Sequence, residues 1–231
     1  MHLHNAAVRI RTSEVELLGK ALTRAFYNDP CAKYIFPDAH ARGALSSWFF
    51  ASAIIRASRF SGEVYTTVNH DGGALWIPPG SEWTIEQAFR TEMPSLPFQF
   101  DRSSIKRWIS VIRYFESVRR IVSDKLHWRL VALGTDPSKP GAVSRATLID
   151  PILAKADSEL RCCYVETFND EDLLSYQEQG FQIAGAGQIP KGGPSFWSLV
   201  RPPRPYANKI PPMRGGLRIL PGGGTAACSH G

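Results

Sequence analysis

Residues 134–151 of the 231-residue chain, GTDPSKPGAVSRATLIDP, have a pattern that suits phosphate chemistry. The pattern is that of a strand that runs through a turn into a helix, and the free N–H groups at such a helix start bind phosphate. Gly141 follows the turn, but Val143 and Arg145 stand where further small residues would let the backbone approach an anion closely. These residues leave open whether a phosphate group binds at this turn.

A second group of side chains offers acid–base chemistry. Imidazole, carboxylate and phenol groups are the ones that enzymes use to move protons. The candidates are His70, His127, Glu166, Asp172 and Tyr176. No cluster of cysteine and histidine has metal-ligand spacing, so we expect no metal.

The composition indicates an ordinary soluble chain, with 43% hydrophobic and 21% charged residues. No apolar run approaches the ~20 residues that span a membrane. The N-terminus lacks the apolar core of a signal peptide, and four cysteines are too few for a disulfide framework. These features predict a cytoplasmic protein without membrane contact.

The formal charge of +6 is concentrated in the C-terminal tail. From Arg201 onward the chain has five basic residues and no acidic one. The tail is rich in Pro and Gly, so we expect a folded domain over 1–203 and a tail over 204–231 without regular structure. Because no folded basic face accompanies the tail, we do not expect nucleic acid as a partner.

The elements that must position these groups follow from periodicity. A short strand, two helices and a hairpin are predicted at 8–12, 13–26, 38–60 and 63–80, and a helical insertion at about 83–125. Strands at 127–135, 162–168, 181–189 and 195–200 then alternate with helices at 141–159 and 170–179. Strand, helix and strand in this order predict a parallel crossover followed by an antiparallel hairpin. The predicted fold class is α/β, a central mixed sheet with helices on both faces.

Five short sequence segments have an order and spacing that resemble those of a known family. They are ALWIPPG (74–80), HWRLVALGTDP (127–137), YVET (164–167), YQEQGF (176–181) and GGPSFWSLVRPP (192–203). Together they resemble the GNAT superfamily of N-acetyltransferases, and most of all the branch that includes puromycin N-acetyltransferase. The resemblance covers about 8–203 and implies the GNAT fold and acetyl transfer from acetyl-CoA to the amine of a small molecule.

The resemblance also implies roles for single residues. The strand at 130–135 would offer backbone groups, from Leu133 to Thr135, to the pantetheine arm of acetyl-CoA, and an N–H near Leu133 would hold the oxyanion of the reaction. Tyr176 matches the family's tyrosine before GF and would protonate the departing thiolate. Glu166 would accept the proton of the amine, directly or through water.

In the same resemblance, the pyrophosphate of acetyl-CoA would lie on the helix start. The residues of that loop are Gly141, Ala142, Val143, Ser144 and Arg145. The superfamily has Gln or Arg, two residues, Gly, one residue and then Gly or Ala here, whereas this chain has Pro140, Val143 and Arg145 at the three specified positions. Arg145 either binds phosphate or occupies its place. Asp172 stands where the branch commonly has Asn, and a carboxylate near phosphate is unfavourable.

Three functions are compatible with these observations. The first is an N-acetyltransferase for a small amine, in secondary metabolism or detoxification, with an acceptor site beside the helical insertion. The second is acid–base chemistry without CoA, as in a lyase, hydrolase or cyclase, using the groups named above, with His127 among them. The third is a binding module without catalysis.

Overall fold

The structure is a computed structural model that describes residues 6–59, 62–81, 101–122, 126–139, 144–204, 218–220 and 224–226. The helices are η1 (Thr12–Glu14), α1 (Val15–Phe26), α2 (Pro30–Ile35), α3 (Ala39–Arg59), α5 (Arg102–Val122), α6 (Arg145–Ser158) and α7 (Glu171–Glu178). The strands are β1 (Val8–Arg9), β2 (Glu63–Thr66), β3 (Gly72–Ile77), β4 (Trp128–Thr135), β5 (Cys163–Thr167), β6 (Gln182–Gln188), β7 (Ser195–Arg201), β8 (Arg218–Leu220) and β9 (Gly224–Ala226).

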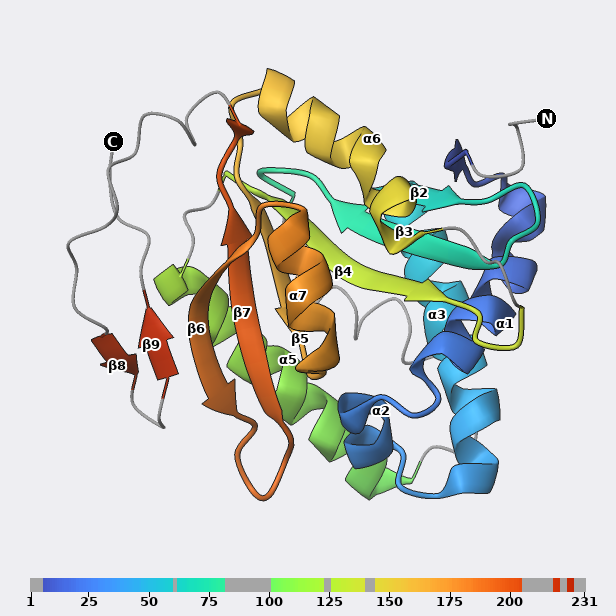
Figure 1. Ribbon diagram of the computed structural model, residues 1–231. Helices are drawn as coiled ribbons and strands as arrows, with labels where there is room; N and C mark the ends of the chain where they lie inside the picture. The colour runs from blue at the N-terminus through green and yellow to red at the C-terminus, as the bar shows by residue number, and fades with distance from the viewer. Residues whose placement is uncertain are drawn as a thin grey trace.

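Seven strands form one mixed sheet in the order β1-β2-β3-β4-β5-β7-β6 (Figure 1). Only the pair β4–β5 within this sheet is parallel, because α6 carries the chain back over the sheet between them. The strands β6 and β7 form the antiparallel hairpin that the sequence predicts, and β7 rather than β6 lies next to β5. The predicted α/β class with a mixed central sheet is confirmed.

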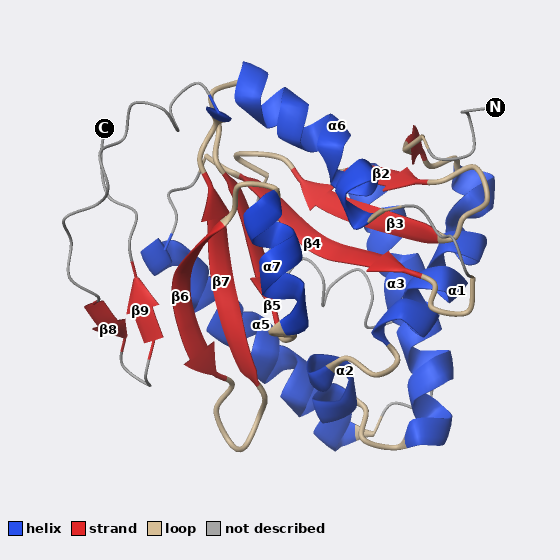
Figure 2. Cartoon of the chain, viewed as in Figure 1, coloured by secondary structure: helices blue, strands red, loops and turns tan. Residues whose placement is uncertain are grey.

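Helices cover both faces of the sheet (Figure 2). On one face α6 and α7 pack against β3, β4 and β5, with Leu148, Ile152 and Tyr176 among the buried residues. On the other face α1 and α3 cover one half of the sheet, and α2 and α5 cover the half around β5 and β7. The two halves of this second face meet where β4 and β5 lie side by side.

A β-bulge in β4 lies where this strand begins to separate from β5. Leu75 of β3 pairs with Ala132, whereas Trp76 pairs with Leu130, so Val131 is an extra residue in β4. A bulge bends its strand and increases the local twist. The strands β4 and β5 pair over Trp128–Leu130 and Cys163–Val165 alone, although β4 runs on to Thr135. The two strands therefore separate beyond the bulge.

The structure describes two of the predicted segments only in part. The insertion predicted at about 83–125 contains α5, and residues 82–100 lie outside the described residues. In the tail, where no regular structure is expected, β8 and β9 pair with each other. In the described part of the chain no helix is both long and apolar enough to cross a bilayer.

Candidate active site

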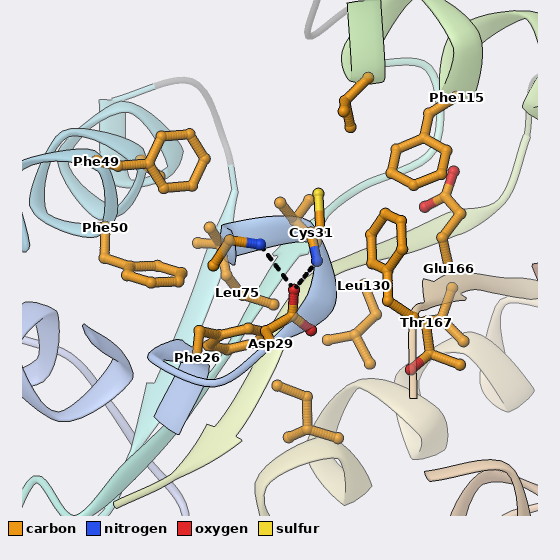
Figure 3. A pocket seen from close by; sticks show the side chains of 18 of the residues that line it. Phe26, Asp29, Cys31, Phe49, Phe50, Leu75, Phe115, Leu130, Glu166 and Thr167 are labelled. Carbon is orange, nitrogen blue, oxygen red and sulfur yellow. Dashed lines mark hydrogen bonds between the residues drawn. The ribbon is translucent and has the colours of Figure 1, made fainter. Parts of the chain in front are cut away.

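A cavity lies where β4 and β5 separate (Figure 3). Residues from eight helices and strands besides β5 line it, so it passes from the α2–α5 side of the sheet toward α7. One part is apolar and largely aromatic. Its lining includes Phe26, Phe36, Phe49, Phe50, Trp108, Phe115 and Phe168. The other part is polar, and its lining includes Asp29, Arg129, Arg145, Glu166, Asp172 and Tyr176.

Tyr176 is at the α7 end of the cavity. It is buried, and its ring packs edge-on against Phe181 with centroids 5.5 Å apart. Burial raises the pKa of Tyr176 to about 12, while the nearby guanidinium of Arg145 acts in the opposite direction. A phenol that stays protonated at neutral pH can donate a proton but cannot act as a base.

Arg145 reaches from the first turn of α6 across to α7. Its two terminal nitrogens bind the two carboxylate oxygens of Asp172, and Nη2 also donates to the backbone oxygen of Leu133 at 3.3 Å. Its guanidinium carbon lies 5.6 Å from the ring centroid of Tyr176. Thr167 adds a hydroxyl to Asp172 at 3.3 Å. The side chain of Arg145 is therefore held inside the cavity by one carboxylate, one carbonyl and one ring.

Glu166 lies at the other end of the polar part, beside Phe115 (Figure 3). Its side chain is 6% exposed, and the nearest cation is Nε of Arg129 at 3.8 Å from Oε2. Burial raises the pKa of this carboxyl, and Arg129, Tyr164 and Arg119 oppose the shift. Oε1 of Glu166 has no hydrogen-bond partner among the described residues. A buried carboxylate with a free oxygen is suited to accept a proton.

Asp29 contributes a third carboxylate that the sequence analysis missed. It caps α2, accepting from the backbone nitrogens of Cys31 at 2.8 Å and Ala32 at 3.1 Å (Figure 3). Asn169 donates to its other oxygen at 3.3 Å. Burial raises the pKa of Asp29. The sequence signal for this helix was present, because Asp followed by Pro is a strong pattern for a helix start.

The other predicted site residues are spread over the molecule. His127 is buried at the start of β4 with its ring 5.5 Å from that of Tyr164, and it is not among the residues that line the cavity. His70 lies in the β2–β3 turn, 3.5 Å from Glu14. Thr135 ends β4 outside the lining. Ser144 caps α6 by accepting from the nitrogen of Ala146 at 3.1 Å.

Three predicted loop residues, Gly141, Ala142 and Val143, lie outside the described residues. Among the residues that are described, no three His, Cys, Asp or Glu side chains gather as a metal site would require. The structure thus brings together Tyr176, Glu166, Leu133 and Arg145 of the predicted set around one cavity.

Comparison with known proteins rests on structure alone. No family model matches the chain, and no curated protein sequence matches it. A structure described as histone acetyltransferase HPA2 and related acetyltransferase from Corynebacterium glutamicum superposes with a TM-score of 0.58 at 18% identity, covering 86% of this chain and 96% of that one. Arylalkylamine N-acetyltransferase 2 from Aedes aegypti gives 0.54 at 10% identity, with 85% and 97% covered. Polyamine N-acetyltransferase from Drosophila melanogaster gives 0.52 at 15%, with 85% and 99% covered.

These similarities define the class of fold. The chain has the fold of the GNAT N-acetyltransferases, with its bulged β4, its separating β4 and β5 and its crossover helix α6. The GNAT fold that the sequence phrases imply is confirmed.

Proposed function

We propose that this protein transfers an acetyl group from acetyl-CoA to the amine of a small, partly apolar molecule. The observation that carries the proposal is one cavity between separating strands, with Tyr176 at one end and Glu166 at the other. A proton donor and a proton acceptor on opposite sides of a reaction centre are what acyl transfer to an amine requires. The fold class supports the same reaction by analogy.

The residues around β4 fit the acetyl-CoA that this fold class implies. The carbonyl of Leu133 points into the gap between the strands, because it accepts from Arg145 there. In an extended strand the N–H and C=O of one residue point to the same edge, so the N–H of Leu133 faces the gap as well. The first turn of α6 supplies the positive end of a helix dipole for the phosphates, and Arg145 can add its charge when it leaves Asp172. When bound, acetyl-CoA supplies an activated acetyl thioester.

The chain's own residues supply the proton transfers. Glu166 Oε1, which has no hydrogen-bond partner in the described part of the chain, accepts the proton of the amine. Tyr176 Oη donates a proton to the leaving sulfur. Because burial raises the pKa of Tyr176, its phenol still carries this proton at neutral pH. The aromatic part of the lining excludes water and accommodates the apolar portion of the acceptor. By analogy with the branch that the sequence resembles, we place this activity in cytoplasmic tailoring or detoxification of small molecules.

One observation favours a second candidate, acid–base chemistry without CoA. Arg145 already occupies the carbonyl of Leu133, a group that the pantetheine arm would use, and Asp172 holds it there. If this pair stays closed, the cavity still offers Glu166 and Tyr176 to a small molecule. The two candidates differ in whether the natural protein binds acetyl-CoA.

The deciding experiment is calorimetric titration of the purified protein with acetyl-CoA. The same titration with pantetheine, which lacks the phosphates, tests the β4 contacts alone. The matched variant is Arg145→Ala/Asp172→Asn, which removes one positive and one negative charge together. We expect the natural protein to bind acetyl-CoA with a Kd of about 1–100 μM. Binding that appears in the double variant alone would instead favour the second candidate.

A further inference from the structure

Three charged side chains form a cluster on the wall of the cavity beside the aromatic residues. They are Glu166 of β5, Arg129 of β4 and Arg119 of α5. Glu166 and Arg129 line the cavity directly, with side chains 6% and 16% exposed. Arg119 acts on both, since burial and the charge of Arg129 lower its pKa while Glu166 raises it. Two guanidinium groups therefore share one buried carboxylate, and Glu116 of α5, which is partly exposed, also acts on Arg119.

Three polar atoms of this cluster are unsatisfied. Oε1 of Glu166 and the Nε atoms of Arg129 and Arg119 are buried and have no hydrogen-bond partner among the described residues. The shortest ion pair, 3.8 Å from Arg129 Nε to Glu166 Oε2, is too long for a hydrogen bond. Buried polar groups in folded proteins normally have partners, so unsatisfied ones around a cavity mark the place of a bound polar group.

We propose that this cluster binds the carboxylate of an acceptor that carries its amine next to that carboxylate. The proposal rests on the proposed function and names its substrate class. With Arg119, Arg129, Glu166 and Glu116, which also acts on Arg119, the charges balance, and a bare ammonium would leave the site with one positive unit. A carboxylate beside the ammonium cancels that charge and gives Nε of Arg129 a hydrogen-bond acceptor.

The geometry favours an α-amino acid with a bulky apolar side chain. Arg129 Nε and Glu166 Oε2 are 3.8 Å apart, so one molecule contacts both when its two groups lie close together, as do the amine and carboxylate on the single α-carbon of an α-amino acid. The aromatic residues continue from this cluster: the rings of Phe115 and Phe168 lie 5.4 Å apart, and those of Phe49 and Trp108 lie 6.0 Å apart. They would receive the side chain.

Three probes test the substrate class by calorimetry without acetyl-CoA. Phenylalanine carries both groups, phenethylamine carries the amine alone, and 3-phenylpropionate carries the carboxylate alone. We expect phenylalanine to bind at least about tenfold more tightly than phenethylamine. The reason is that, of the two, only phenylalanine has a carboxylate that can make a charge-assisted bidentate contact with Arg129. Measurable binding of 3-phenylpropionate is expected as well.

Arg129→Gln tests the residue. It should weaken phenylalanine binding about 10- to 100-fold and leave phenethylamine binding equal or tighter, because one positive charge is removed, so that the preference for phenylalanine disappears or reverses. The control Arg113→Gln changes an exposed arginine of the same helix as Arg119 and should keep the preference. Equal or tighter binding of phenethylamine to the natural protein would overturn the proposal, as would absence of binding by both carboxylate probes at millimolar concentration.

The outcome is independent of the acetyl-CoA titration. Failure of acetyl-CoA to bind, with the preference for phenylalanine intact, would remove the acetyltransferase proposal and retain the carboxylate site. Binding of acetyl-CoA without a preference for phenylalanine would retain the acetyltransferase proposal and remove the carboxylate site.

Discussion

Two arginine–carboxylate pairs line the same cavity, and they differ in how complete they are. Arg145 and Asp172 make two hydrogen bonds, and Arg145 adds a third to Leu133. Arg129 and Glu166 approach no closer than 3.8 Å and leave a nitrogen and an oxygen without partners among the described residues. Nε of Arg145 is also buried without a partner among the described residues, so the pairs differ in the contact between their two side chains, which is closed by hydrogen bonds in one pair and open in the other.

The difference indicates a structural role for the closed pair and a ligand-binding role for the open pair. A closed bidentate pair fixes the start of α6 against α7 and limits access to Leu133. An open pair in a buried wall has lost water without gaining hydrogen bonds, a state that a ligand relieves. We therefore assign the open pair to the acceptor and the closed pair to the control of the donor side.

The largest effect is expected at the open pair. Glu166→Gln removes the proton acceptor and should lower kcat/KM about 100- to 10,000-fold in an assay of thiol release from acetyl-CoA. Because burial raises the pKa of Glu166, the rate of the natural protein should rise with pH as this carboxyl loses its proton, and the variant should lose that rising limb. Glu178→Gln, at an exposed position of α7, is the control. An unchanged pH profile in Glu166→Gln would assign the base elsewhere.

Beside the closed pair, Tyr176→Phe should lower kcat about 100-fold while the Kd of acetyl-CoA changes by less than about threefold. The phenol gives up a proton but, in this proposal, holds no part of the donor. Steady-state rates together with the calorimetric Kd make the separation. Tyr114→Phe is the matched control, because Tyr114 packs on Phe196 outside the lining of the cavity. Equal loss in both variants would indicate packing rather than proton donation.

The sequence predicted the frame of this site well and its side-chain pairing poorly. Alternating and helical apolar patterns located the strands around Leu133 and Glu166, and Tyr176 stood in a recognisable phrase. Arg145 and Asp172 each departed from the family pattern in isolation, and 27 positions separate them, so no local pattern shows that they neutralise each other.

Arg129 carried a signal that was not used. It is a charged residue within the apolar strand HWRLVALGT, where an inward-facing charge needs a partner or a ligand. Arg119 gave less indication, because α5 carries several arginines and periodicity alone does not show which of them faces the cavity.

The stability of the closed pair gives a smaller effect. Arg145→Gln leaves Asp172 without its main partner and should lower the free energy of unfolding by about 1–3 kcal/mol in urea titrations. Arg145→Gln/Asp172→Asn should cost less than the sum of the two single changes, with a coupling of about 0.5–3 kcal/mol. Additive changes would mean that the contact between the two side chains contributes nothing to stability.

The smallest effect should come from the open pair in the free protein. Arg129→Gln should change the free energy of unfolding by less than about 1 kcal/mol, because it removes a distant ion pair, whereas Arg145→Gln removes three hydrogen bonds. The remaining carboxyl of Glu166 can take up a proton, since burial already raises its pKa. Urea titrations of Arg129→Gln and Arg145→Gln under the same conditions make the comparison direct. A loss at Arg129 as large as that at Arg145 would show that both pairs stabilise the fold, and the distinction between a closed and an open pair would fail.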